Sequence, residues 1–355
     1  MPELHHVLPA LLISLLPALC MAEATPISPG LACKSEKQAI NEEGFVDIGG
    51  IPQWITIKGK HCGNPVILVL HGGPGNTMSP YASAIYGAWE KDYTLVQWDQ
   101  RGAGKTYGKN KPTEDTSLTV AQMAEDGVAL ATYLTQHLGK KKIILTGSSW
   151  GSILGVQMSL SKPELFYAYV GTSQVVSYKV NQTASYTRVL GLAQVASDQE
   201  TITKLNALGT PPWSNPRNFG VLRKAIRKYE AQRTDRAPAT WWAPEPAYAT
   251  PAAQADYESG EDYSFLKFVG YEGDGMFSKV AFSEYATKFA IPVFFVQGAE
   301  DLLTMPEITR QYVDSITAPH KEYILVPRAG HDPNLPFIEA QLKLLNERVR
   351  PLSNQ

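Results

Sequence analysis

Ser149, Asp301 and His331 are three side chains whose types and positions suit nucleophilic catalysis. Ser149 lies in the pattern Gly147-x-Ser149-x-Gly151. A serine hydroxyl is a weak nucleophile at neutral pH, so it needs an adjacent base and a turn that exposes its oxygen. Glycines on either side let a strand and a helix pack closely around such a turn. The pattern alone is common, but an apolar strand precedes it and a helix follows it, so we predict Ser149 as the nucleophile.

His331 is the predicted general base. It follows Gly330 in the loop after the last predicted strand, and this loop lies at the carboxyl edge of the sheet, where the serine turn also emerges. His71 belongs to a glycine-rich loop, and the remaining histidines fit surface or structural positions or lie in the N-terminal segment: His5, His6, His61, His137 and His320.

Asp301 is the predicted acid that orients the histidine. It comes just after an apolar strand that ends near Gly298, and the chain order serine, acid, histidine is typical of hydrolases with this serine turn. Glu300 is the neighbouring alternative and fits a solvated position better. A second interpretation of Asp301 is a helix cap before Pro306.

Two backbone N–H groups are predicted to bind the oxyanion of the tetrahedral intermediate. One belongs to Trp150, which follows the nucleophile, and the other to Gly73 in the loop from His71 to Gly75. Each such donor is typically worth about 3 kcal/mol of transition-state stabilisation. The alternative for the loop is a tight turn of the kind that any strand-to-helix unit uses.

The run from Gly102 to Thr106 ends like a phosphate-binding loop, but the match fails. The first glycine of that motif would stand at position 99, which is Asp99, and we expect a loop and no helix from Thr106 onward. Nucleotide hydrolysis is therefore not predicted.

Apolar strands that alternate with helices must position these residues, which predicts a mostly parallel sheet with helices on both faces. A hairpin is expected at 44–58, turning at Gly49-Gly50, and a capping box of Thr119 with Gln122 begins a helix that ends at Gly139. Another helix should run from 335 to about 348. Further strands are predicted at 65–70, 93–98, 143–145, 167–172, 292–297 and 322–326.

The strand rhythm breaks between residues 173 and 284, which predicts an inserted, mainly helical cap. The sequence then divides into a first core part at 25–172, the cap at 173–284 and a second core part at 285–355. Residues 1–24 read as a signal peptide.

The apolar run from Val7 to Cys20 is too short for a membrane span, and small residues follow it at the spacing of an export cleavage site. We predict cleavage after Ala24 and a secreted or periplasmic protein without stable membrane insertion. The alternative is a buried N-terminal helix, and a lipid anchor on Cys20 is not favoured, because Pro17-Ala18-Leu19 lacks a small residue just before the cysteine.

Cleavage would leave Cys33 and Cys62 as the remaining cysteines, and such a pair in an oxidising compartment predicts a disulfide. Two free buried thiols are the alternative. The full chain has 32 Lys and Arg against 34 Asp and Glu. This balance favours a small-molecule or short-peptide substrate and gives no basic excess for nucleic acid.

Three motifs resemble the proline iminopeptidase family of α/β-hydrolases. They are His-Gly-Gly-Pro-Gly at 71–75, Trp-Asp-Gln-Arg-Gly-Ala-Gly at 98–104 and Gly-Ser-Ser-Trp-Gly-Ser at 147–152. The resemblance implies the α/β-hydrolase fold, the same triad and oxyanion donors, and structural roles for Asp99 and Arg101. It also implies release of N-terminal residues, often proline, from peptides. The predicted Ser-His-Asp mechanism needs no metal or organic cofactor.

Family members of this kind hold the substrate's amino group with cap carboxylates. Here Asn181 and Gln182 stand where an acid would be sought, and each candidate glutamate is predicted to be a solvated surface residue: Glu230, Glu245, Glu258, Glu261 and Glu272. Aromatic residues of the cap are expected mainly to pack, with pocket lining as the alternative: Trp213, Trp241, Trp242, Tyr257, Tyr263, Tyr271 and Phe277.

The leading prediction is an exported serine aminopeptidase, and the alternative is a carboxylesterase or related acyl hydrolase with an apolar cap pocket. A non-catalytic binding protein is a third reading, which the complete triad disfavours. Epoxide hydrolase and dehalogenase chemistry is also disfavoured, because serine stands where those enzymes have aspartate.

Overall fold

The computed structural model describes residues 27, 30–113, 116, 118–213 and 215–354. The predicted signal peptide, residues 1–24, lies outside the described residues. Among the helices that are described, none is long and apolar enough to cross a membrane.

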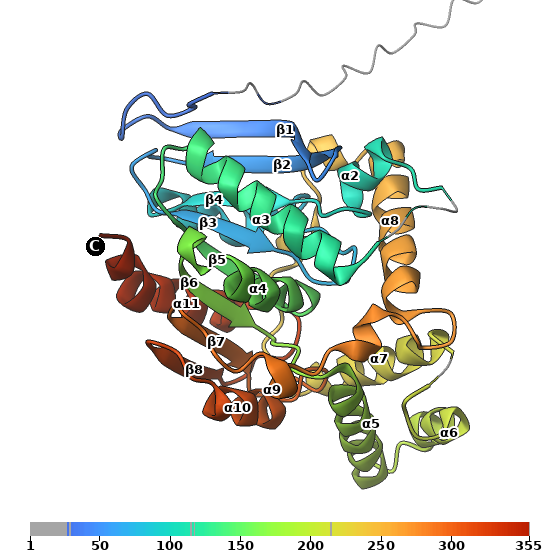
Figure 1. Cartoon of the computed structure of the whole chain (residues 1–355). Helices are drawn as coiled ribbons and strands as arrows, with labels where there is room; N and C mark the ends of the chain where they lie inside the picture. The colour runs from blue at the N-terminus through green and yellow to red at the C-terminus, as the bar shows by residue number, and fades with distance from the viewer. Residues whose placement is uncertain (1–26, 28–29, 114–115, 117, 214, 355) are drawn as a thin grey trace, which may run out of the picture.

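An eight-stranded sheet forms the centre of the fold, with the strand order β1-β2-β4-β3-β5-β6-β7-β8 (Figure 1). The β1–β2 hairpin turns at Gly49-Gly50, where φ is positive at both residues. β2 pairs antiparallel with β4, and every later pairing is parallel. The strands are β1 (Ile40–Ile48), β2 (Ile51–Gly59), β3 (Val66–Leu70), β4 (Thr94–Trp98), β5 (Ile143–Ser148), β6 (Phe166–Thr172), β7 (Val293–Gly298) and β8 (Lys321–Val326).

Helices cover both faces of this sheet because consecutive strand side chains point to opposite sides. Leu68 and Leu145 share one core cluster with α3 (Val120–His137), α4 (Trp150–Ser161) and α10 (Pro306–Ser315). Ile67 and Ile144 share the other with α1 (Ala82–Tyr86) and α11 (Leu335–Leu344). The predicted mostly parallel sheet with helices on both faces is confirmed.

The cap segment, residues 173–284, lies between β6 and β7. It holds α5 (Tyr178–Val195), α6 (Gln199–Leu208), α7 (Arg217–Glu230) and α8 (Pro251–Val269), and α9 (Phe282–Tyr285) follows at its end. Helices α5, α6 and α7 have a hydrophobic cluster of their own, which includes Leu302 of the core. In Figure 1 they lie beyond the lower right of the sheet, and α8 runs beside α2.

One local prediction is wrong. The chain after Gly102 forms the short helix α2 (Gly104–Lys109) where the sequence predicted a loop. The Asp99 carboxylate accepts a hydrogen bond from the Lys105 N–H at 2.9 Å, and Thr106 Oγ1 donates to the Asp99 carbonyl at 2.5 Å. Asp99 lies outside the helix and satisfies the Lys105 N–H at the helix N-terminus. Such a contact leaves no periodic pattern in the helix sequence.

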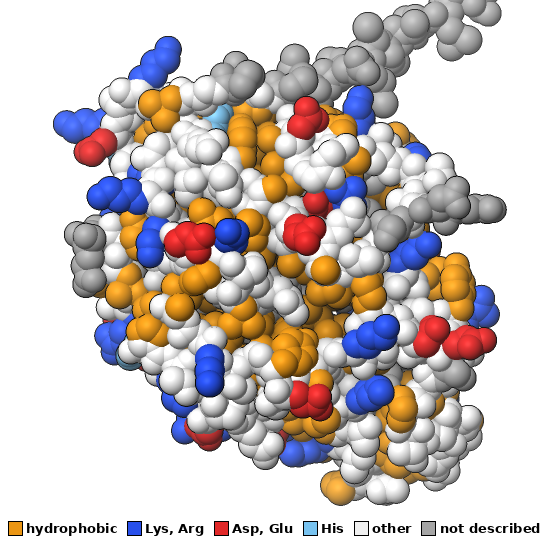
Figure 2. All heavy atoms as spheres, viewed as in Figure 1, with side chains coloured by type: hydrophobic (Ala, Val, Ile, Leu, Met, Phe, Trp, Pro, Cys, Tyr) orange, Lys and Arg blue, Asp and Glu red, His pale blue; other side chains and the backbone are white. Residues whose placement is uncertain are grey.

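A disulfide joins Cys33 to Cys62, with their Cα atoms 5.7 Å apart. It connects the segment before β1 to the residues that follow β2. Charges of both signs are interspersed on the molecular face shown in Figure 2.

Candidate active site

Ser149 stands at the sharp turn between β5 and α4. Its backbone has φ 51° and ψ −118°, a conformation that is strained for a residue with a side chain. The two flanking positions have no room for a side chain. A Cβ on Gly151 would lie 2.2 Å from the Leu70 carbonyl oxygen, and a Cβ on Gly147 would lie 2.5 Å from the Gly151 carbonyl oxygen. The turn therefore holds the Ser149 hydroxyl at the carboxyl edge of the sheet.

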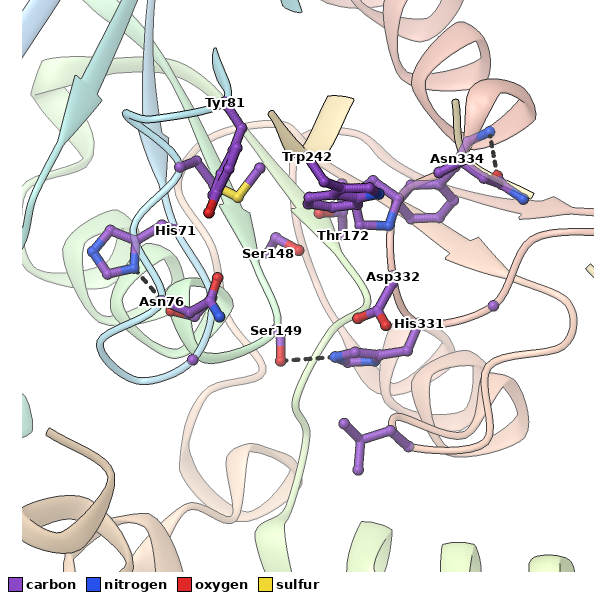
Figure 3. A pocket seen from close by; sticks show the side chains of 18 of the residues that line it. His71, Asn76, Tyr81, Ser148, Ser149, Thr172, Trp242, His331, Asp332 and Asn334 are labelled. Carbon is purple, nitrogen blue, oxygen red and sulfur yellow. Dashed lines mark hydrogen bonds between the residues drawn. The ribbon is translucent and has the colours of Figure 1, made fainter. Parts of the chain in front are cut away.

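The structure brings the three predicted catalytic side chains together. Ser149 Oγ lies 3.0 Å from His331 Nε2, as the dashed line in Figure 3 shows. His331 Nδ1 lies 3.1 and 3.2 Å from the two carboxylate oxygens of Asp301. Asp301 follows β7 and His331 follows β8, so both come from carboxyl ends of strands. With Nδ1–H donating to the carboxylate, Nε2 is free to accept the serine proton.

Asp301 is held by more donors than His331 alone. Gln297 Nε2 donates to its Oδ2 at 2.7 Å, the Leu303 and Thr304 N–H groups donate to Oδ1 at 2.8 Å, and the Thr304 hydroxyl donates to Oδ2 at 2.6 Å. Burial acts to raise the pKa of Asp301, but the attraction of His331 and these hydrogen bonds outweigh it, so the pKa lies below its ordinary value. Asp301 is thus an ionised partner for His331.

The two alternatives considered for this acid are not found. Glu300 pairs with Arg233 at 3.2 Å, away from His331. Helix α10 begins after Met305, and no side chain caps its N-terminus.

The predicted oxyanion donors flank Ser149. Trp150 is the first residue of α4, so its N–H has no acceptor within the helix. Gly73 lines the same cleft as Ser149, and a Cβ on the preceding Gly72 would lie 3.4 Å from Ser149 Cβ, so the glycine loop passes directly beside the nucleophile.

Gln100 and His71 support this loop. Trp150 Nε1 donates to Gln100 Oε1 at 3.0 Å, and Gln100 Nε2 donates to the His71 carbonyl at 3.2 Å. Burial lowers the pKa of His71 to about 4, so its ring is neutral and serves as a structural acceptor for the Gln100 N–H. The loop before α2 is fixed by Asp99 and by the buried pair of Arg101 with Asp126, at 2.7 Å, which fits the structural roles that the family resemblance implied.

A cleft of about 730 Å³ opens above Ser149 and His331. Trp242 and Tyr257 of the cap line it together with Tyr81, and Phe277 lines a smaller cavity of about 40 Å³ that also reaches Ser149. The other aromatic candidates pack or lie outside: Trp241 and Tyr263 against the core, Trp213 among the cap helices and Tyr271 in solvent. Asn181 and Gln182 line the smaller cavity.

Two of the five candidate cap glutamates line the cleft, Glu230 and Glu261. Glu261 accepts a hydrogen bond from Asn76 Nδ2 at 3.2 Å, next to the glycine loop. The remaining three do not line it, and Glu245 is instead paired with Lys58 at 3.2 Å.

The prediction that Glu230 is a solvated surface residue is wrong. Only 5% of the residue is exposed, because α7 docks on the loop that carries Asp301 and Glu230 Oε1 accepts a hydrogen bond from the Leu302 N–H at 2.8 Å. Burial raises the pKa of Glu230 to about 7, and repulsion from Asp301 adds to the effect.

The chain belongs to the α/β hydrolase fold family, whose model matches residues 65–336. A probable aminopeptidase of Bacillus subtilis (strain 168), YbaC, is 28% identical over 311 residues, which cover 84% of this chain and 93% of the relative. A probable proline iminopeptidase of Streptomyces coelicolor (strain ATCC BAA-471 / A3(2) / M145) is 26% identical, and the match covers 87% of this chain and 95% of that relative.

The crystal structure of a proline iminopeptidase from Mycobacterium smegmatis covers 88% of this chain and 99% of its own, with a TM-score of 0.63 and 16% identity. That likeness concerns the fold. Taken with the relatives, it confirms the predicted resemblance to the proline iminopeptidases and the class of serine hydrolase.

Proposed function

We propose that this protein is an exported aminopeptidase that releases an N-terminal residue, proline or a similar one, from short peptides. The observation that carries the proposal is the continuous set of hydrogen bonds from Ser149 through His331 to Asp301, at the floor of a cleft that a cap carboxylate also lines.

In the proposed mechanism, His331 takes the proton of Ser149 Oγ as this oxygen attacks the carbonyl carbon of the first peptide bond. The N–H groups of Gly73 and Trp150 bind the resulting oxyanion. His331 then gives the proton to the leaving amine, the C–N bond breaks and an ester of Ser149 remains. Water, activated by His331, hydrolyses this ester and releases the first amino acid.

Glu261 is our candidate for binding the substrate's ammonium group. Glu261 is half-buried on α8 and lines the cleft. Its Oε1 accepts the hydrogen bond from Asn76, which places this oxygen on the side of the glycine loop. Glu230 is the less suitable candidate, because its Oε1 already accepts the Leu302 N–H and its pKa of about 7 leaves it neutral much of the time near neutral pH.

A carboxylesterase is the second candidate function. The aromatic side chains of Tyr81, Trp242 and Tyr257 in the cleft favour it, because they offer an apolar surface to an ester's acyl or alcohol group.

The experiment is hydrolysis of three substrates by the purified protein: proline naphthylamide, its N-acetyl form and a short-chain nitrophenyl ester. We expect the free amine to be preferred over the acetylated form by about 100-fold in kcat/KM, the worth of a part-buried charged hydrogen bond. Glu261→Gln should abolish most of this preference, whereas Glu258→Gln, an exposed glutamate on the same helix, should leave it unchanged. Ester cleavage with neither amide hydrolysed would contradict the aminopeptidase and support the esterase.

Export is part of the proposal and rests on the N-terminal sequence together with the disulfide, a bond typical of oxidising compartments. Mass spectrometry of the protein recovered from the periplasm or the medium of a bacterial host should give a chain that begins at Thr25. An intact chain retained in the cytoplasm would contradict it.

A further inference from the structure

Three arginines line the cleft on the side of His331: Arg223, Arg227 and Arg236. Arg223 Nη2 donates to Asp332 Oδ1 at 2.5 Å, and Arg227 Nε lies 3.5 Å from the other oxygen of the same carboxylate. Asp332 directly follows the proposed base, so both guanidinium groups are paired with the loop that carries His331.

Arg236 lies against the same loop. The carbonyl of the preceding Asp235 accepts a hydrogen bond from Asn334 Nδ2 at 3.0 Å. The Arg236 side chain is exposed at the cleft and has no hydrogen-bond, ion-pair or ring partner among the residues that the structure describes.

Arg236 is left without a carboxylate partner among the described residues in this part of the cleft. Arg223 and Arg227 share one aspartate, and Asp235 is already paired with Arg328, with its Oδ1 2.7 Å from the Arg328 Nε. The other carboxylates nearby are Asp301, which is bonded to His331, and Glu230, which lies 4.0 Å from Arg223 Nη1. The pKa of Glu230, about 7, keeps this carboxyl protonated for part of the time near neutral pH.

The opposite side of the cleft carries the opposite charge. In Figure 3, Asn76 and Tyr81 lie on one side of Ser149, and His331, Asp332 and Asn334 lie on the other. Glu261 is bonded to Asn76, and Arg223 is bonded to Asp332. The nucleophile is thus flanked by an acidic group on the glycine-loop side and by basic groups on the histidine side.

The chemistry of the reaction fixes which part of a peptide lies on each side. His331 must protonate the leaving nitrogen, so the residue that leaves as an amine lies on the histidine side. In a dipeptide this residue carries the free C-terminal carboxylate, and a planar guanidinium binds a carboxylate well.

We infer that Arg236, with Arg223 and Arg227, forms a subsite for the C-terminal carboxylate of short peptides, so that zwitterionic dipeptides are the preferred substrate class. This inference rests on the proposed aminopeptidase activity and adds a specificity-determining arginine to it. The released N-terminal residue keeps its ammonium group at Glu261, and the second amino acid leaves with its carboxylate at the arginines.

The test compares a prolyl dipeptide with its C-terminal amide, at low and at high salt. We expect the wild-type protein to prefer the free carboxylate about tenfold in kcat/KM, mainly through KM, and the preference to shrink in 0.5 M salt because exposed charges are screened. Arg236→Gln should reduce the preference about threefold, the usual contribution of an exposed ion pair, because kcat/KM falls more for the dipeptide than for the amide.

Arg233→Gln is the matched control. Arg233 is an exposed arginine three residues away that pairs with Glu300 and does not line the cleft, so its replacement should leave the preference intact. Arg223→Gln is the second variant, expected to act in the same direction as Arg236→Gln.

Binding is measured separately from turnover by titrating the Ser149→Ala protein with both peptides. Tighter binding of the dipeptide than of the amide, weakened by Arg236→Gln, supports the subsite even if no peptide is cleaved, in which case the aminopeptidase proposal alone fails. Equal binding of both peptides, or an equal loss for both in Arg236→Gln, would overturn the subsite whatever the turnover.

Discussion

At the scale of single residues, Glu230 has the surroundings that differ most from those of an ordinary glutamate. It is a cap residue whose carboxylate touches the loop that carries Asp301, through the Leu302 N–H. The titratable and charged groups around it are Asp301, His331 and Arg223, and burial together with the nearby Asp301 charge raises the pKa of Glu230 to about 7. Its ionisation therefore couples the docking of α7 to pH.

Replacing Glu230 with Gln should change how stability depends on pH. The pKa of Glu230 is raised from 4.5 in the unfolded chain to about 7 in the folded one, so its contribution to the free energy of unfolding is fully present below pH 4.5 and is lost as the pH rises through 7. Glutamine keeps an acceptor for Leu302 but does not titrate. The Tm of Glu230→Gln minus that of the wild type should therefore increase by a few degrees from pH 5 to pH 8.

Calorimetry at the two pH values checks this. Glu258→Gln, on the exposed side of α8, serves as control and should show a constant difference. A constant difference for Glu230→Gln as well would mean that this carboxyl titrates normally in the folded protein.

Sequence reasoning reached the triad residues because strand ends and chain order restrict where each can lie. It named Glu230 and Glu261 only among five candidate glutamates, each predicted to be solvated, and it did not name Arg236. The direction in which each of these side chains points is set by the tertiary packing of its helix or loop. The apolar residues of α7 face its hydrophobic cluster, but they give no sign that its last residue, Glu230, packs inward against Leu302.

At the scale of elements, the turn from β5 to α4 depends on close backbone approach. Gly151 lies in the first turn of α4, directly against the end of β3, and a Cβ there would meet the Leu70 and His71 carbonyl oxygens at 2.2 and 2.6 Å. These are main-chain atoms of a central strand, which have little freedom to move.

Gly151→Ala should consequently destabilise the protein by about 3 kcal/mol, at the upper end of ordinary overpacking. Gly191→Ala is the matched control, because Gly191 is also in a helix, α5, and a Cβ there would have no atom within 4 Å. This control should stabilise the protein by about 0.5–1 kcal/mol through helix propensity. Urea unfolding curves measure both, and equal effects of the two substitutions would refute the packing argument.

The strands were predictable because each buried strand is a continuous apolar run between turn residues. Helix α2 was not predictable, since Asp99 binds the Lys105 N–H at its N-terminus and the hydroxyl of its Thr106 is bonded to Asp99 and to the Trp54 N–H of β2.

At the scale of the whole molecule, a disulfide and several hydrogen bonds attach the chain before β1 to the rest of the fold. Cys33 is bonded to Cys62, and the Ala32 N–H donates to the His137 carbonyl at the end of α3 at 2.9 Å. The disulfide encloses a loop with a sequence separation of 29 and thereby restricts the unfolded chain.

Replacing both cysteines with serine should lower the free energy of unfolding by about 3 kcal/mol, the usual value for a loop of this size. A reducing agent should lower the Tm of the wild type by several degrees and leave the double variant unchanged. Equal Tm values for the oxidised wild type and the double variant would contradict a stabilising role.

The central claim is that Ser149 is the nucleophile of a hydrolase whose base is His331. The most direct measurement is turnover of proline naphthylamide by Ser149→Ala beside the wild type, with the fold of both checked by circular dichroism. We predict that kcat falls by at least about 10⁴-fold while the variant still binds the substrate. Unchanged turnover in a folded Ser149→Ala protein would contradict the account.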